Sequence, residues 1–383
     1  MMLEMRNHNM ALLNVHAALQ RYSNKTLDVF GGVYFLSHGV SFPLVMLMWA
    51  ASFLIRFLLR PLSVWLSIKL GLKWALVVGI IAGSGLFFVF TRVDGVNIWL
   101  AVFAVYLAFY DILYWLPYHA YYAASGEEER RGRHVAFGAT LVSLVQIIMP
   151  LGGAVLAANF GFNYLYASAM ACMILSVIPV LLAHDVPLGK QMRLRQAWRE
   201  TDRRGFVMSI GNGLLENGHI FMWTIVLFTL TSGLVSFGGL LTTELLLTSV
   251  ISLIIGRSID KGKAGWAARS GALIIASVII ARSFWVTTTS QIIVSNFVAA
   301  LGIALLNMVY TVKLYNFAQK TESTLWFHFF AEAGWDIGST IIMLLAAGLF
   351  VIGVPIQYMM LLGIAGLLVI DRVLVEKSTT TPR

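Results

Sequence analysis

The chain has 383 residues, of which 59% are hydrophobic and only 12% are charged. A water-soluble domain of this length needs a far larger charged surface, so the composition excludes a soluble globular protein. The net charge of +9 does not indicate a nucleic-acid partner. The basic residues stand in short connections beside apolar segments, where they would face anionic lipid head groups.

Twelve apolar segments follow one another along the chain. About 20 helical residues cross the roughly 30 Å hydrocarbon layer of a bilayer, and lipid admits only helices and closed barrels as spanning structures. The sequence therefore predicts an all-α membrane protein with twelve transmembrane helices. The predicted spans are residues 10–36, 42–68, 74–90, 96–122, 135–158, 162–183, 206–229, 233–255, 268–286, 292–315, 324–350 and 355–373.

The distribution of the basic residues predicts the orientation. If the N-terminus lies in the cytoplasm, most of the 27 Lys and Arg residues fall in cytoplasmic connections. Only Arg92 and Arg282 fall on the outer side, both near span ends. This positive-inside asymmetry predicts that both termini are cytoplasmic.

One long basic connection, residues 184–205, divides the chain. Apolar Met192, Leu194 and Trp198 alternate there with arginines, which predicts a short interfacial helix. We therefore expect an N-terminal six-helix bundle in residues 1–183, a cytoplasmic linker in 184–205 and a C-terminal six-helix bundle in 206–383. A repeated six-helix unit is typical of a transporter whose binding site lies between two halves.

Short motifs in the connections strengthen this interpretation. The segment from Gly256 through Asp260 to Lys261 follows the eighth span, and a partial copy with Gly71 between two lysines follows the second span. Together with an Arg-Gly turn at residues 129–133, they resemble the loop motifs of the major facilitator superfamily, in its bacterial type. The motif residues that would form a conformational latch are Lys69, Gly71, Lys73, Arg133, Gly256, Asp260 and Lys261.

The resemblance implies two six-helix bundles that alternate access to a central cavity lined by spans 1, 2, 4, 7, 8, 10 and 11. It also implies a multi-pass protein of the bacterial inner membrane. In the latch, the Asp260 carboxylate can cap a helix or pair with an arginine. Such a contact biases the transport equilibrium by about a few kcal/mol at most.

Ionisable residues inside the spans indicate where the function lies, because each needs a partner or a water-filled cavity. Arg21, Lys25 and Asp28 share one face of the first span, and Arg56 lies near the middle of the second. This cation-rich N-terminal half predicts a substrate with an anionic group. The candidate substrate-binding residues are Arg21, Lys25, Arg56, Asp111, Tyr114, Trp115, Asn212 and Glu216.

The C-terminal half has the opposite charge balance. His328, Glu332 and Asp336 fall on one face of the eleventh span at successive turns. Two ionised carboxylates at this spacing repel each other, so one of them should be protonated or matched by a cation. The candidate proton-coupling residues are Asp28, Glu216, His328, Glu332 and Asp336.

Structural roles stay open for several of these charges. Lys25 could pair with Asp28 inside the first span, and Asp111 could pair with an arginine of the second span. Arg60 could extend to the cytoplasmic surface, and Glu244 could face the polar residues of the seventh span. The eight histidines are scattered over different segments, so we expect no metal site and no cofactor.

These features favour a secondary active transporter over an enzyme, a channel or a receptor. No phosphate-binding loop for ATP is present, and no paired acid and base residues indicate a membrane-embedded enzyme. We expect a monomer with a small-molecule substrate, a proton or other coupling ion, and membrane lipid as its partners. The alternative is a multidrug-type exporter of amphipathic or cationic compounds, which the aromatic residues and the 16 methionines favour.

Overall fold

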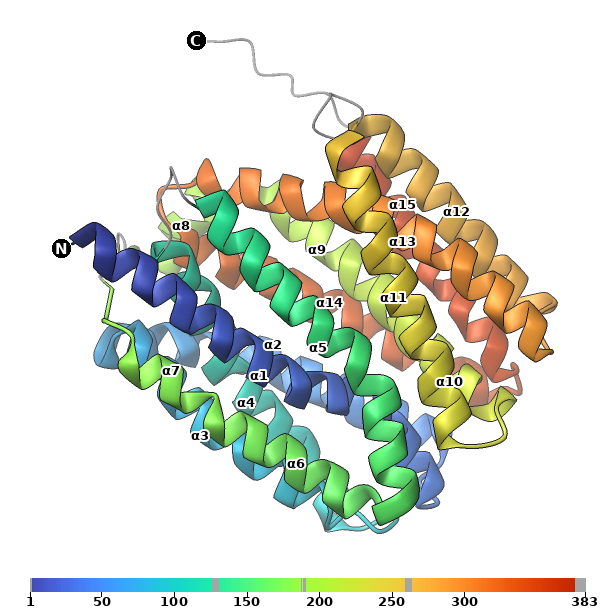
Figure 1. Cartoon of the computed structure of the whole chain (residues 1–383). Helices are drawn as coiled ribbons and strands as arrows, with labels where there is room; N and C mark the ends of the chain where they lie inside the picture. Colours follow the sequence, from blue (N-terminus) through green and yellow to red (C-terminus); the bar gives the residue numbers. More distant parts are fainter. Residues whose placement is uncertain (1, 126–130, 187, 189–190, 259–263, 376–383) are drawn as a thin grey trace.

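The computed structural model describes residues 2–125, 131–186, 188, 191–258 and 264–375, and every regular element in these ranges is a helix. The helices run roughly side by side in one bundle (Figure 1). Each of the twelve predicted spans coincides with one helix or with two or three consecutive helices. The all-helical fold with two six-helix halves is therefore confirmed.

The first half contains the spans that precede the linker. Its sixth span is interrupted at Ser176, whose carbonyl oxygen accepts a hydrogen bond of 2.8 Å from Nδ1 of His16. The helices are α1 (Met2–Ser37), α2 (Phe42–Leu70), α3 (Leu72–Phe90), α4 (Ile98–Ser125), α5 (Arg131–Phe160), α6 (Phe162–Leu175) and α7 (Val177–Leu182).

The second half follows the short linker helix α8 (Leu194–Glu200). Its first span contains a π-helical turn, and its last span begins with a 3₁₀ turn. The elements are α9 (Arg203–Leu215), η1 (Glu216–Phe221), α10 (Met222–Leu230), α11 (Leu234–Ser258), α12 (Ala264–Phe284), α13 (Thr289–Gln319), α14 (Thr324–Val351), η3 (Ile356–Leu362) and α15 (Gly363–Val375).

Eleven spans among the described residues are long and apolar enough to cross a membrane. The exception is α1, although its 36 residues exceed the length required. Arg21, Lys25 and Asp28 interrupt its apolar sequence. Since α1 packs against α5 and α6, it belongs to the bundle despite its polar middle.

The predicted helix in the linker is confirmed as α8. Trp198 anchors it, with ring centroids 5.3 Å from Phe206 and 4.9 Å from Phe330. Asp202 then caps α9 by accepting a hydrogen bond of 3.0 Å from the backbone N–H of Arg204. Partial burial raises the pKa of the Asp202 carboxyl, but the bonds from Arg204 outweigh it and hold this pKa below its usual value.

The two halves meet along two helix pairs, α2 with α14 and α5 with α11. We call the end of the bundle that carries α8 the linker end, and the other the opposite end. Near the opposite end, a Cβ on Gly238 of α11 would collide with the carbonyl oxygen of Pro150 in α5. Thr242 of α11 also donates a hydrogen bond of 3.0 Å to the carbonyl of Ile147. Toward the linker end, α5 and α11 diverge (Figure 1).

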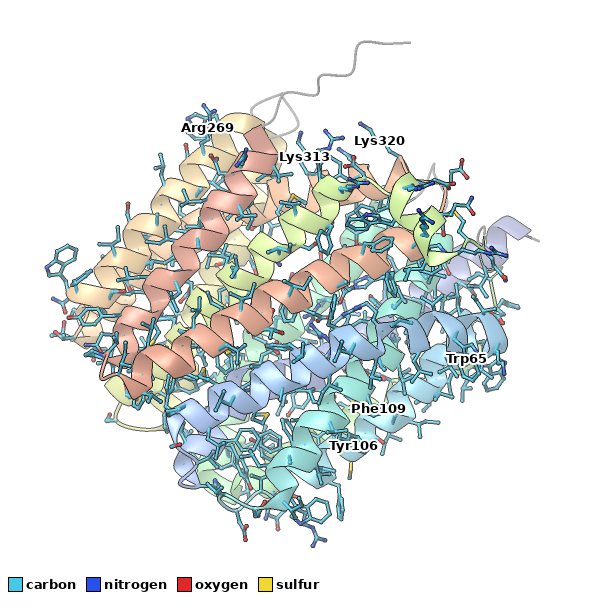
Figure 2. All side chains as sticks on the ribbon, turned by 180° about the vertical axis from the view of Figure 1, so that it is seen from behind. Trp65, Tyr106, Phe109, Arg269, Lys313 and Lys320 are labelled. Atoms are coloured by element: carbon cyan, nitrogen blue, oxygen red, sulfur yellow. The ribbon has the colours of Figure 1, made fainter. Side chains whose placement is uncertain are left out.

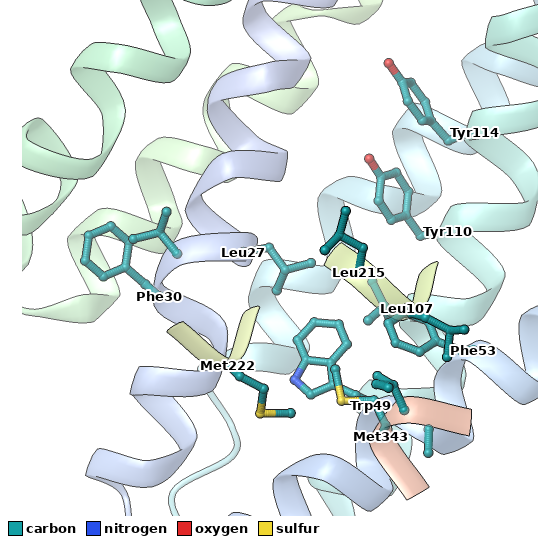
Figure 3. Close-up of a cluster of buried hydrophobic side chains, with 14 of the residues drawn as sticks. Leu27, Phe30, Trp49, Phe53, Leu107, Tyr110, Tyr114, Leu215, Met222 and Met343 are labelled. Atoms are coloured by element: carbon teal, nitrogen blue, oxygen red, sulfur yellow. The ribbon is translucent and has the colours of Figure 1, made fainter. Parts of the chain in front are cut away.

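Apolar side chains from both halves close the middle of the opposite end. Trp49 of α2 packs edge-to-face on Phe221 with ring centroids 5.8 Å apart. Leu27, Met222 and Met343 gather around Trp49 (Figure 3). Gly32 of α1 lets the Phe221 side chain approach, since a Cβ there would lie 3.3 Å from it. These contacts form an apolar seal between the halves.

Close packing of α9 on α14 gives a first testable prediction. A Cβ at Gly338 would collide with the carbonyl oxygen of Ile210, so Gly338→Val should overpack this contact and destabilise the fold by about 1–3 kcal/mol. Gly348→Ala, in the same helix but with no atom within 4 Å of the added Cβ, is the matched control. Thermal unfolding of the purified variants measures both. Equal stability of the two variants would contradict the prediction.

Candidate functional site

A cavity of about 710 Å³ lies between the two halves. All seven spans that were expected to line it do so, as α1, α2, α4, α9 to α10, α11, α13 and α14. Two further helices contribute as well, α5 through Gln146 and Ile147 and α12 through Arg282. The central cavity is therefore confirmed, and its wall is wider than expected.

The cavity opens toward the linker end. Toward the opposite end, the wall residues His219 and Arg282 are only 1% and 2% exposed. Asn307, Thr311 and Tyr315 follow one another along α13 toward the linker end and are exposed. Solvent therefore reaches the cavity from the linker end, while the apolar seal closes the opposite end.

Three charged residues of α1 line the cavity, as the sequence predicted. Arg21 and Lys25 are half-buried, and Asp28 is exposed to the cavity. Within the described part of the chain, none of them forms a hydrogen bond or an ion pair within 4.0 Å, so Lys25 and Asp28 do not form the close pair considered above. On the other side of α1, Ser23 donates to the carbonyl of Ala169 at 2.7 Å, which fixes the face that α1 turns to the cavity.

A cluster of charges joins α2 and α4 of the first half to α14 of the second. Arg56 and Arg60 of α2 both bind the Asp336 carboxylate, and Arg56 also binds Asp111 of α4 at 2.8 Å. Glu332 completes the cluster, 3.8 Å from Arg60. We call these five residues the clasp. Asp111 is thus paired with an arginine of the second span, one of the alternatives left open by the sequence.

The clasp changes two expectations. Arg60 does not extend to the surface, because it is 1% exposed and bound to a carboxylate of the other half. Asp336 does not line the cavity, because it is fully buried behind Arg56 and Arg60. The repulsion predicted between Glu332 and Asp336 is therefore relieved by cations.

Glu332 is the most accessible carboxylate of the clasp, with 23% of its side chain exposed. It lines the cavity, and Nε2 of His119 lies 3.6 Å from it. The His119 ring stacks on His328, with centroids 5.1 Å apart. His328 and Glu332 therefore both lie at the cavity wall next to the contact between the halves.

The remaining candidate residues are divided between the cavity wall and the protein interior. Asn212 and Glu216 line the cavity, and Glu216 accepts a hydrogen bond of 2.8 Å from Trp335. Trp115 also lines it and donates to Asp111 at 3.1 Å. Tyr114 does not line it, because its side chain points toward α1, where its hydroxyl lies 3.1 Å from His16.

The position of Arg282 differs from the one predicted. Arg282 was assigned to the outer surface, but it is buried and bound to Glu244 at 3.0 Å and to Asn296 at 2.7 Å. Glu244 in the middle of a span was the available signal, since a membrane-embedded carboxylate needs a partner. His219 is also buried in this cluster, 3.0 Å from Arg282.

A second polar network was also missed, in the first half. The hydroxyl of Tyr110 donates to Asn24 at 2.7 Å and accepts from Gln20 at 2.6 Å. Gln20 in turn accepts from Ser176 at 2.9 Å. These residues come from the first, fourth and sixth spans, and only folding brings them together.

The described latch residues make contacts inside the first half. Lys73 donates to the carbonyls of Leu181 and Ala183 at 2.8 and 2.7 Å, at the end of α7. Gly71 separates α2 from α3 at φ 80°, a conformation that favours glycine, and Lys69 lies over the Trp65 ring at 4.3 Å. Asp260 and Lys261 lie outside the described residues, and only the backbone of Arg133 and Gly256 is described.

The Lys and Arg residues at the helix ends gather as the sequence predicted. Figure 2 shows Arg269, Lys313 and Lys320 at one end of the bundle.

Among the described residues, no group of three or more His, Cys, Asp or Glu side chains could hold a metal ion. The chemistry available in the cavity is therefore ion pairing, hydrogen bonding, proton exchange and apolar contact.

Three solved structures have a similar arrangement of helices. The chain is similar to the human organic anion transporter MFSD10 (TETRAN), with 12% identity and a TM-score of 0.69 over 96% of this chain and 99% of the other. It is similar to an autoinhibited peptide transporter of the POT family, with 10% identity and a TM-score of 0.71 over 97% and 98% of the two chains. For the POT family transporter PepTSo, identity is 9% and the TM-score 0.70 over 95% and 97%.

At these identities, the similarity to solved structures shows the fold alone. No curated protein sequence matches the chain. The sequence model of the Major Facilitator Superfamily, however, matches residues 17–331, which is most of the chain. The chain is therefore a multi-pass membrane protein that belongs to the Major Facilitator Superfamily, a family of secondary transporters.

Proposed function

We propose that the chain is a proton-coupled secondary transporter of a small organic solute that carries an anionic group. One observation carries this proposal: Arg21 and Lys25 line the central cavity and have no bonded partner among the described residues, whereas Arg56 and Arg282 there are held by carboxylates. An incoming anion would therefore find two cations that are free to bind it. Trp49 and Phe53 in the same wall offer apolar contact to the rest of the solute.

Alternating access follows from the two ends of the cavity. The seal at the opposite end and the opening at the linker end describe one of two states, and rocking of the halves would exchange them. From the basic residues at the linker end we infer, by the positive-inside rule, that this end faces the cytoplasm. The described state is then inward-facing, both termini are cytoplasmic, and the membrane is the bacterial inner membrane. The rocking units are residues 1–183 and 206–383, joined by the linker 184–205.

The clasp supplies a link between protonation and this movement. It joins the halves through charges that are almost fully buried, so the halves can separate along α2 and α14 only if these charges are matched in another way. Protonation of Glu332 would remove one negative charge next to Arg60 and weaken the contact. Because Glu332 is partly exposed to the cavity, a proton can reach it from the cavity water.

Export of a cationic amphipathic compound is the second candidate function. It is favoured by Asp28, which is exposed to the cavity, and by Glu216, which lines it with no ion-pair partner among the described residues. Aromatic Tyr310 and Trp335 stand near Glu216 in the cavity wall and could contact an organic cation. The two candidates differ in which residues of the wall bind the substrate.

The double change Arg21→Gln with Lys25→Gln tests the anion-binding residues. If both cations bind the anionic group, transport of organic anions by proteoliposomes should fall at least about tenfold, since a charge-assisted hydrogen bond contributes about 1.5–3 kcal/mol. Lys313→Gln, which removes a cation outside the cavity wall, should transport like the original chain. Undiminished anion transport by the double variant, with loss of cation transport in Asp28→Asn, would favour the second candidate function.

The change Glu332→Gln tests coupling. The neutral amide imitates a protonated Glu332, so exchange of substrate across the membrane should persist while accumulation driven by a pH gradient is lost. Solute counterflow and pH-driven uptake in the same proteoliposomes separate these two activities. A variant that still accumulates substrate in response to pH would show that Glu332 is not the coupling site.

The change Arg56→Gln tests whether this arginine holds the fold. It leaves Asp111 without its cation and Asp336 with Arg60 alone, and breaking a buried ion pair costs about 3–5 kcal/mol. We therefore expect a strong loss of thermal stability as well as loss of transport. An Arg56→Gln protein with unchanged melting temperature but no transport would assign Arg56 to substrate binding instead.

A further inference from the structure

The cluster around Arg282 is not used by the function proposed above. Arg282 of α12 donates to Glu244 of α11 at 3.0 Å and to Asn296 of α13 at 2.7 Å. It also donates to Nε2 of His219 in η1 at 3.0 Å. Its guanidinium lies 3.9 Å above the ring of Trp223 in α10. Four other elements of the second half therefore surround this cation of α12.

This cluster differs from the clasp in what it connects. All of its members belong to the second half, so it does not hold the two halves together. His219, Trp223, Glu244 and Arg282 nevertheless line the central cavity. They lie toward the opposite end, since Arg282 is in the last turn of α12 and Trp223 follows the Phe221 that packs in the seal. The cluster is therefore part of the cavity wall next to the seal.

The cluster holds one positive and one negative charge. Because Nε2 of His219 accepts a hydrogen bond from Arg282, this imidazole is neutral and carries its proton on Nδ1. Glu244 is then the one anionic partner of Arg282 among the described residues. The Arg282 side chain is 0% exposed and that of Glu244 is 11% exposed. Both side chains line the cavity, and Glu244 is the more exposed of the two.

The other ionisable groups on the elements around this pair are bound elsewhere or stand apart from it in the chain. Glu216 of η1 is bound to Trp335 at 2.8 Å, Tyr358 lies in η3, and Asp371 and Arg372 lie near the C-terminal end of α15. In α5, which packs against α11, residues 140–160 contain no Asp, Glu, Lys, Arg or His. In α13, which contributes Asn296 and Ser295, no charged residue occurs before Lys313. On α1, Asp28 is the charged side chain closest in sequence to the seal. A change of charge at Arg282 must therefore be balanced by Glu244 or by a ligand.

We propose that Arg282 and Glu244 form a second anion subsite, in which Glu244 takes up a proton when an anionic group replaces it at Arg282. The proposal rests on the proposed transport of an anionic solute. Two ionised carboxylates beside one buried guanidinium repel each other strongly, whereas one carboxylate and one neutral carboxylic acid do not. The proton moves from cavity water to Glu244, the Arg282–Glu244 bond breaks, and a bond from Arg282 to the anion forms. Binding of the anion and of the proton would thereby be linked.

Infrared spectroscopy of the protein in lipid nanodiscs can test this proposal, with benzoate as the anionic probe. The original chain should show a carboxylic acid C=O band on acidification that is missing in Glu244→Gln, and benzoate should make this band appear at higher pH. Glu200→Gln, which removes a carboxyl group of the linker helix α8 outside the cavity wall, is the matched control and should retain the band. If Glu244→Gln does not fold, Glu244→Asp keeps the carboxyl group and should shift the band.

Two results would overturn the proposal. Spectra that are the same in the original chain and in Glu244→Gln would show that Glu244 binds no proton. A band that benzoate leaves at the same pH would show that no anion replaces Glu244 at Arg282, so that the cluster only ties the helices of the second half together. Neither result bears on Arg21 and Lys25, so transport of anions that depends on those two residues would remain.

Discussion

A charge in the interior of a membrane protein is stable only where another charge, a hydrogen bond or water meets it. In this chain that requirement connects the two halves. Asp336 of α14 is fully buried, and its only ion-pair partners among the described residues are Arg56 and Arg60 of α2. The first half thus supplies the cations that make a carboxylate of the second half possible, and separation of α2 from α14 would expose all three groups at once.

The charges of the cavity fall into three environments that differ in their freedom. Those of the clasp are bound across the halves and change partners only if the halves move. Arg282 and Glu244 are bound within the second half, where they can respond to a ligand without such movement. Arg21 and Lys25 form no hydrogen bond or ion pair within 4.0 Å among the described residues, and Asp28 on the same helix attracts both. The charges of the cavity wall therefore differ in how firmly the protein holds them.

Close packing of backbones explains why the cavity is closed at the opposite end and open at the linker end. In lipid, helices associate through small residues that let their backbones approach. Gly238 allows α11 to touch α5 at Pro150, and Gly32 allows α1 to approach Phe221. Trp49 then fills the centre of the seal. Toward the linker end, α5 and α11 diverge (Figure 1), and polar Asn307 and Thr311 face solvent.

The pattern of apolar and polar residues was sufficient to predict the twelve spans and a helix in the linker, while the resemblance to the superfamily supplied the list of helices that line the cavity. Segment length and hydropathy are properties of the chain itself, and the positions of Arg21, Lys25, Glu216 and Glu332 within their spans indicated the cavity. The same pattern could not identify the partner of each charge. Arg282 lies in the last turn of the apolar helix α12, a position that is typical of a residue at the membrane surface.

The sequence by itself therefore determined the fold class, the two halves and the charged residues that need a partner or a cavity. The tertiary structure alone decided that Arg60 binds Asp336, that Arg282 binds Glu244 and that Tyr114 faces His16. It also decided that Arg21 and Lys25 have no bonded partner in the part of the chain that the structure describes. The physical reason is that helix formation depends on local composition, whereas ion pairing depends on which helix faces meet. Helices far apart in the sequence, such as α2 and α14, are brought together only by packing.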